Sequence, residues 1–202
     1  MSIKIKRHLQ FRYPAEAALF GSLATVPKIT RRDVNLPEGL VRVIAGQMLS
    51  AKAAATIYGR LQDASIKKKL AGSWMLGSKT LRNCGLSGNK VAAVRKLASL
   101  VKDNPKALDH WYDLDATTLH AEVSSMHGIG PWSASIISMF YVGHEDIFPS
   151  GDNSLNRALK MLNNQPARRK SRQVFKPELA APYRSYLALY LWKALDTGVL
   201  VD

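Results

Sequence analysis

Apolar residues recur at helical spacing in nearly every segment of this chain, and this pattern constrains the fold more than any other feature. Between residues 50 and 61, for example, one stripe consists of Ala51, Ala54, Ala55, Tyr58 and Leu61. Ser50, directly before this stripe, is a natural N-cap. No convincing alternating run indicates a sheet, and no fixed-period repeat is present. The sequence therefore predicts an all-α protein.

Capping residues delimit the other predicted helices. Ser78 opens a short helix that stops at Gly85, and Ser87 caps a longer one that ends before Pro105. Further helices are expected from Asp115 to Met126, from Pro131 to Gly143, after Asp152, and from Ala181 to Leu195.

Two basic, proline-bounded stretches, residues 26–37 and 165–177, are expected to be loops. The second carries a cluster of cations at Arg168, Arg169, Lys170 and Arg172. Such a cluster is either a solvated loop or a patch that follows a phosphate backbone.

The composition indicates a polyanionic partner. The 202 residues hold 29 Lys and Arg against 15 Asp and Glu, a net charge of +14, which favours nucleic acid over an anionic membrane. The single cysteine, Cys84, excludes a disulfide framework, a four-thiolate iron–sulfur cluster and a thiolate-rich zinc site. The sequence contains no run of about 18 apolar residues, so no membrane span is predicted. Residues 1–11 lack the apolar core of a secretory signal, so we expect an intracellular protein of the cytoplasm or nucleoid.

The segment from Met126 to Ala134 (MHGIGPWSA) is the most informative part of the chain. Gly128 and Gly130 permit positive φ and close backbone approach, so that successive N–H groups can point at one anion. The helix that follows adds its own unpaired N–H groups, which suit a phosphate. Many glycine turns between helices bind nothing, but the flanking helices and the basic charge favour a phosphate-binding hairpin.

The stretch GIGPWSA, followed by DIFPSGD at residues 146–152, resembles the helix-hairpin-helix DNA glycosylases, and in particular the AlkA-type 3-methyladenine DNA glycosylase II family. Three further segments agree with that family and follow its order, at 43–57, 81–98 and 181–196. The resemblance implies one glycosylase domain over residues 1–202, made of two helical lobes with a cleft between them. One lobe would span about residues 36–157, including the hairpin at 124–134. The other would combine about residues 1–35 with about residues 158–202.

The resemblance assigns the catalytic aspartate to Asp152. Cleavage of an N-glycosidic bond builds positive charge on the sugar, and a fixed carboxylate stabilises that charge and can orient or deprotonate a water. Asp152 can also serve as the N-cap of the following helix, and the two roles are compatible. Asp146 is expected to be structural.

Trp132 stands where strand-cutting members of the superfamily carry a Schiff-base lysine, so we expect water to be the nucleophile and the enzyme to be monofunctional. The resemblance assigns Trp132 and Trp192 to an aromatic base pocket, which attracts a cationic alkylated purine. Ile136 joins this pocket at a position that is often aromatic in the longer relatives. Core packing is the alternative role of Trp192.

The turn from Gln47 to Ser50 corresponds to the family's DNA wedge. Met48 or Leu49 would enter the minor groove, and Gln47 could hydrogen-bond the base left without its partner. Core filling is the alternative for Met48. The hairpin would bind phosphates through Gly128, Gly130 and Ser133.

No cofactor is expected. The family often holds a weak, monovalent-type cation at the hairpin, here through the backbone carbonyls of Ser124, Met126 and Ile129. The five histidines show no ligand spacing for a catalytic metal and are expected at the surface.

The sequence thus predicts a monomeric, monofunctional DNA glycosylase that flips and excises alkylated purines, of the 3-methyladenine and 7-methylguanine type, from damaged double-stranded DNA in base excision repair. One alternative keeps the fold but acts on uracil or hypoxanthine. The other is a non-catalytic helix-hairpin-helix DNA-binding module, which would have no use for Asp152 in its sequence context.

Overall fold

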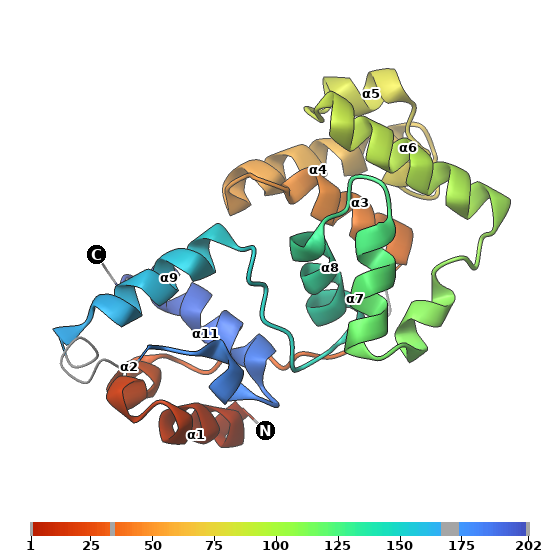
Figure 1. Ribbon diagram of the computed structural model, residues 1–202. Helices are drawn as coiled ribbons and strands as arrows, with labels where there is room; N and C mark the ends of the chain where they lie inside the picture. The colour runs from red at the N-terminus through yellow and green to blue at the C-terminus, as the bar shows by residue number, and fades with distance from the viewer. Residues whose placement is uncertain (1, 33–34, 167–173, 201–202) are drawn as a thin grey trace. The chain divides into compact units, whose positions relative to one another are not determined.

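A computed structural model of the protein describes residues 2–32, 35–166 and 174–200. Every regular element within these residues is helical, which confirms the all-α prediction (Figure 1). The chain divides into two compact units. The hairpin unit is Arg31–Val142, and the terminal unit combines Met1–Thr30 with Gly143–Asp202. No helix among the described residues is long and apolar enough to cross a membrane.

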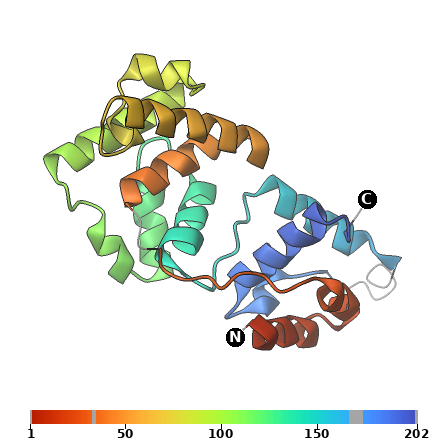
Figure 2. The same cartoon turned by 180° about the vertical axis from the view of Figure 1, so that it is seen from behind.

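The hairpin unit is built around α3, which packs against α4, α6 and α8. Seen from behind, α3 lies between α4 and α8 (Figure 2). Leu40 and Ile44 of α3 are fully buried in a core that also contains Leu61 and Trp111. The helices of this unit are α3 Leu36–Gly46, α4 Ala51–Lys67, α5 Ser78–Asn83, α6 Gly88–Asp103, α7 Ala116–Ser125 and α8 Pro131–Ile137.

Local capping explains most helix starts in this unit. Ser50 accepts a hydrogen bond from the Ala53 N–H at 3.3 Å and so caps α4 as predicted. Ser87 precedes α6 as predicted, but its hydroxyl accepts no capping bond. The predicted loop at 26–37 ends two residues early, because Asn35 caps α3 and Pro37 lies in the first turn of that helix.

The terminal unit packs α11 against α9 and α1 against α2. Tyr186 and Tyr190 of α11 are buried, and the ring of Tyr13 stacks on that of Phe175 with centroids 4.4 Å apart. The helices of this unit are α1 Ser2–Arg12, α2 Ala17–Ser22, α9 Asn153–Asn164 and α11 Arg184–Asp196. α11 therefore begins three residues later than the predicted start at Ala181.

Neither α1 nor α2 was predicted from the sequence. α1 is mostly polar, and of its side chains from residue 3 onward only Ile5 and Leu9 are buried. Two apolar residues are too few to produce a readable periodicity, so this helix depends on tertiary packing.

The boundary between the units differs from the expected one near residue 157. Residues 143–157 belong to the terminal unit, because the segment that begins at Gly143 is bonded to the start of α11. The Arg184 guanidinium, for example, binds Asp146 at 2.8 and 2.9 Å.

Candidate active site and nucleic-acid interface

The turn between α7 and α8 joins two well-defined helix ends. Asp115 caps α7 by accepting hydrogen bonds from two backbone N–H groups of its first turn, at 2.9 and 3.1 Å. α8 begins at Pro131, directly after Gly130. Ile129 is 5% exposed and belongs to the core cluster. The predicted hairpin is therefore present, and its isoleucine is buried in the core.

Only one of the two hairpin glycines needs its conformational freedom. Gly128 has φ +76°, and a Cβ at this position would lie 2.7 Å from the Cβ of Ala93. Gly130 has φ −98°, which any residue adopts, and a Cβ there would meet nothing within 4 Å. Gly128 thus adopts the positive φ that both glycines permit, whereas Gly130 does not. Because Gly130 has no side chain, the space in front of the first residue of α8 is left open.

Ser133 lies below the hairpin surface. It is 1% exposed, and its Oγ accepts a hydrogen bond from Gln47 Nε2 at 3.0 Å. The hydroxyl of Ser133 is therefore bonded within the protein, whereas a phosphate contact through its side chain or its N–H was predicted.

The turn from Gln47 to Ser50 presents two apolar side chains to solvent. Met48 is 89% exposed and Leu49 is 41% exposed. The alternative of core filling is therefore excluded for Met48. Met48 has φ +57°, a left-handed conformation that turns the chain sharply between α3 and α4. Gln47, in contrast, directs its amide toward the hairpin, where Nε2 is 2.9 Å from the Gly128 carbonyl oxygen.

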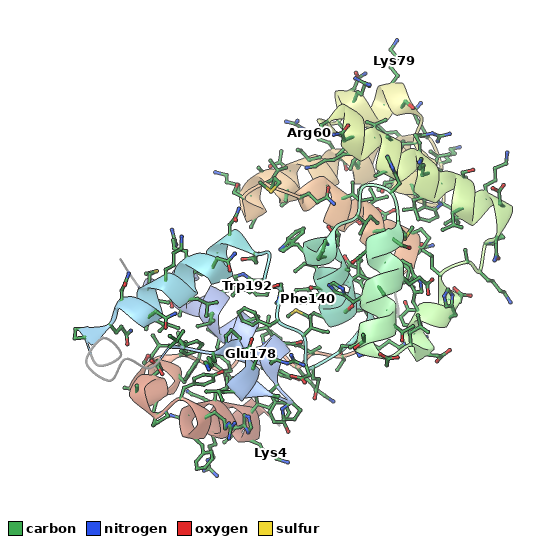
Figure 3. The ribbon with its side chains drawn as sticks, viewed as in Figure 1. Lys4, Arg60, Lys79, Phe140, Glu178 and Trp192 are labelled. Carbon is green, nitrogen blue, oxygen red and sulfur yellow. The ribbon has the colours of Figure 1, made fainter. Side chains whose placement is uncertain are left out.

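A cavity of about 670 Å³ lies within the hairpin unit. Trp132 and Ile136, both predicted for the base pocket, line it together with Phe140 and Tyr141 (Figure 3 labels Phe140). The last two belong to a short π-helical turn at Ser138–Val142 and were not predicted as site residues. The spacing of four residues from 132 to 136 to 140 was a signal that could have identified Phe140.

Cations and a hydrogen-bonded tyrosine surround this cavity. The guanidinium carbon of Arg42 lies 5.5 Å from the centroid of the Tyr58 ring, and that of Arg32 lies 5.9 Å from the Tyr141 ring. Tyr58 donates a hydrogen bond to Glu38 Oε1 at 2.8 Å. Burial, together with this bond to a carboxylate, raises the pKa of Tyr58, so its hydroxyl stays protonated and neutral.

Asp152 lies in the terminal unit, directly before α9. Its Oδ1 accepts a hydrogen bond from the Leu155 N–H at 2.9 Å, which is an N-cap, and another from Trp192 Nε1 at 3.1 Å (Figure 3 labels Trp192). Asp152 is partly buried. The expected capping role is confirmed. Trp192 is partly buried on α11 and holds the carboxylate by its indole N–H, a contact that neither predicted role of Trp192 included.

The segment leading to Asp152 is bonded to the first turn of α11. Arg184 pairs with both carboxylate oxygens of Asp146, and these hydrogen bonds hold the pKa of Asp146 below its usual range. The hydroxyl of Ser185 accepts from the Ile147 N–H at 2.9 Å and donates to the His144 carbonyl at 2.8 Å. The structural role expected for Asp146 is therefore confirmed.

Metal ligands do not gather in the part of the chain that the structure describes, where no three His, Cys, Asp or Glu side chains come together. At the hairpin, the Met126 carbonyl accepts a hydrogen bond from the Ile129 N–H at 3.1 Å. This bond closes the turn, and the carbonyl oxygen keeps a second lone pair for another partner.

His8 and His144 have a buried Nε2, so the expectation that all five histidines lie at the surface is wrong. The basic cluster Arg168, Arg169, Lys170 and Arg172 lies outside the described residues.

Several known proteins are similar to this chain, although no family model matches it. DNA-3-methyladenine glycosylase 1 of Schizosaccharomyces pombe is 26% identical over 170 residues, which cover 82% of this chain and 73% of the relative. A probable bifunctional transcriptional activator/DNA repair enzyme AlkA of Mycobacterium tuberculosis is 28% identical over 178 residues. The match covers 83% of this chain and only 35% of that longer protein.

The solved structures that resemble this chain include proteins of the same kind as these sequence relatives. The Schizosaccharomyces pombe 3-methyladenine DNA glycosylase in complex with abasic DNA superposes with a TM-score of 0.76 at 22% identity, covering 98% of this chain and 100% of that one, and so shows the fold. A DNA-3-methyladenine glycosidase from Bacillus halodurans has a TM-score of 0.67 at 26% identity, covering 95% of this chain and 90% of that one. These comparisons show that the chain is similar to the 3-methyladenine DNA glycosylases of the helix-hairpin-helix type and shares their fold.

Proposed function

We propose that this protein is a DNA glycosylase that hydrolyses the N-glycosidic bond of alkylated purines in double-stranded DNA. The observation that carries the proposal is the carboxylate of Asp152, which two N–H donors from different helices hold in one orientation. The family relationship supports the substrate class, since the relatives are named for 3-methyladenine.

The reaction uses Asp152 as an electrostatic stabiliser. Departure of the base leaves positive charge on the deoxyribose, and a carboxylate fixed in advance stabilises it without reorganising. The same carboxylate orients the attacking water or accepts its proton. The leaving base of an alkylated purine is already activated, so the protein needs no strong acid.

Strand cleavage through an imine is not part of the proposed reaction. Position 132, at the start of α8, is a tryptophan, and Lys106 is the only lysine between Lys102 and Lys160. A Schiff base requires a lysine amine near the sugar. The proposed enzyme is therefore monofunctional and leaves an abasic site.

The DNA is held by charge and bent by the exposed turn. The net charge of +14 attracts the phosphate backbone. Met48, 89% exposed, is the proposed wedge, with Leu49 beside it. Open space at Gly130 lets a phosphate approach the backbone N–H groups at the start of α8.

The cavity beside Trp132 is the proposed base pocket. Its aromatic lining, from Trp132 to Phe140, suits the electron-poor ring of an alkylated purine. A weak cation at the carbonyls of Ser124, Met126 and Ile129 would tighten the hairpin. We propose that the protein acts as a monomer, without a catalytic metal.

The test is release of base from methylated duplex DNA in the presence of a chelator. We expect the natural protein to release 3-methyladenine or 7-methylguanine and leave alkali-sensitive sites. Asp152→Asn should be about 100-fold slower or worse, while still binding DNA. Asp115→Asn is the matched control, since it changes another N-cap aspartate to an equally good cap and should keep full activity.

Other outcomes have distinct meanings. Full activity of Asp152→Asn would contradict the assigned role. Binding without release of any base would favour the non-catalytic module, and release of only uracil or hypoxanthine would favour the alternative substrates. Trapping of a covalent adduct by borohydride would overturn the monofunctional assignment.

A further inference from the structure

The Gln47 side chain links the exposed turn to the hairpin. Its Nε2 is 2.9 Å from the Gly128 carbonyl oxygen and 3.0 Å from Ser133 Oγ. The two residues it reaches are 81 and 86 positions further along the chain. An amide nitrogen carries two hydrogens, and both have an acceptor here. The Gln47 amide nitrogen therefore has no hydrogen left for a DNA base unless one of these bonds breaks.

Lys90 holds the same turn from below. Its Nζ donates to the carbonyl oxygens of Ala45 at 3.0 Å and of Gln47 at 2.8 Å. These carbonyls lie at the end of α3, where no further helical N–H is available, and where a cation is electrostatically favoured. Partial burial lowers the pKa of Lys90.

α6 also supports the hairpin. At Gly128 the backbone runs so close to Ala93 that a Cβ would lie 2.7 Å from the alanine methyl. Lys90 and Ala93 are less than one helical turn apart on α6. Figure 1 shows the loop between α7 and α8 reaching up to α6. The turn, the hairpin and α6 thus contact one another pairwise.

The contacts among the turn, the hairpin and α6 explain how Met48 can be exposed and still keep an unfavourable backbone conformation. A methionine at φ +57° persists only where the flanking chain is fixed. Gln47, the preceding residue, is bonded through its carbonyl to Lys90 and through its amide to the hairpin.

We propose that Gln47 and Lys90 are positioning residues that lock the Met48 turn to the hairpin, so that phosphate binding and insertion of Met48 take place on one rigid surface. The inference rests on the proposed function, because it takes the hairpin as the phosphate site and Met48 as the wedge. It assigns Gln47 a role within the protein in place of the predicted contact with the unpaired base.

The test measures insertion of Met48 into DNA separately from excision of a base. The probe is a duplex with a tetrahydrofuran abasic-site analogue and 2-aminopurine as its neighbour on the same strand, whose fluorescence rises when the wedge unstacks it. Gln47→Ala should bind this duplex about tenfold more weakly, as expected for two lost hydrogen bonds. It should also reduce the fluorescence gain at saturation. Ser133→Ala removes one acceptor and should produce part of the same loss.

Double variants distinguish positioning from direct contact. In a Met48→Ala background, adding Gln47→Ala should change the fluorescence gain by less than twofold, because the wedge is already absent. The Gln47→Ala loss should also be the same whether thymine, cytosine or no base stands opposite the abasic site. A loss that disappears without the opposite base, or that is fully additive with Met48→Ala, would overturn the proposal.

Variants of Lys90 provide a second test of the proposal. Lys90→Met keeps the length of the side chain without its charge and should reduce the fluorescence gain, whereas Lys90→Arg should restore most of it. Circular dichroism checks that each variant is as helical as the natural protein. An equal fluorescence gain for Lys90→Met and the natural protein would contradict the role of Lys90. If the natural protein unstacks the probe but releases no alkylated base, the proposed function fails while this inference stands.

Discussion

Replacing Gly128 by alanine should destabilise the hairpin unit far more than the same change at Gly130. At Gly128 the left-handed backbone, φ +76°, costs an alanine roughly 1–2 kcal/mol. The new methyl group would also lie 2.7 Å from the Ala93 Cβ, well inside contact distance. Overpacking of this kind costs about 1–3 kcal/mol, so the total loss should be about 2–5 kcal/mol.

Gly130→Ala is the matched control, since its φ of −98° suits any residue and its Cβ would meet nothing within 4 Å. Alanine is a weaker N-cap than glycine, so about 0.5–1 kcal/mol should be lost. Urea unfolding followed by circular dichroism measures both variants. Equal losses, or a Gly128→Ala protein as stable as the natural one, would refute this reasoning. Under the proposed function, Gly130→Ala should fold normally and yet bind duplex DNA more weakly.

Three further predictions concern single contacts. Met48→Ala should leave the free energy of unfolding within about 0.5 kcal/mol, since the side chain is 89% exposed, but should lower affinity for abasic duplex; a large loss of stability would argue against an exposed wedge. Trp192→Phe removes a hydrogen bond to the Asp152 carboxylate and should slow base release about tenfold or more; an unchanged single-turnover rate would contradict this positioning. Because the pKa of Asp146 is lowered by Arg184, the pair stabilises the terminal unit fully above the unfolded pKa of 3.8 and loses this contribution as pH falls below it. The pair is more than a third exposed, so the contribution is under about 1 kcal/mol and should vanish in Asp146→Asn; acid unfolding curves that coincide for the two proteins would refute it.

The candidate site was only partly predictable, because its residues differ in how local their signals are. Asp152, Trp132 and Ile136 lie in or beside short motifs that resemble the glycosylase family, and this resemblance identified them. Phe140 continues the spacing of Trp132 and Ile136 but lies beyond the end of α8, in a π-helical turn.

Other positions had no local signal. Ser133 was predicted to contact a phosphate because it follows the hairpin, yet its side chain is buried, with the residue 1% exposed. Its hydrogen-bond partner is Gln47, 86 residues earlier in the chain. The bond from Trp192 to Asp152 spans 40 residues and is equally invisible to a pattern of apolar spacing.

The order of residues alone determined the helical class, the capped starts at Ser50 and Asp115, the glycine hairpin and the strong positive charge. Each of these depends on interactions within a few residues or on composition, which the sequence states directly. Tertiary structure decided which buried partner each polar side chain has, as for Gln47 and Trp192. It also decided that the polar α1 is a helix and that residues 143–157 join the terminal unit. These features depend on contacts between distant segments, and such contacts exist only once the chain has folded.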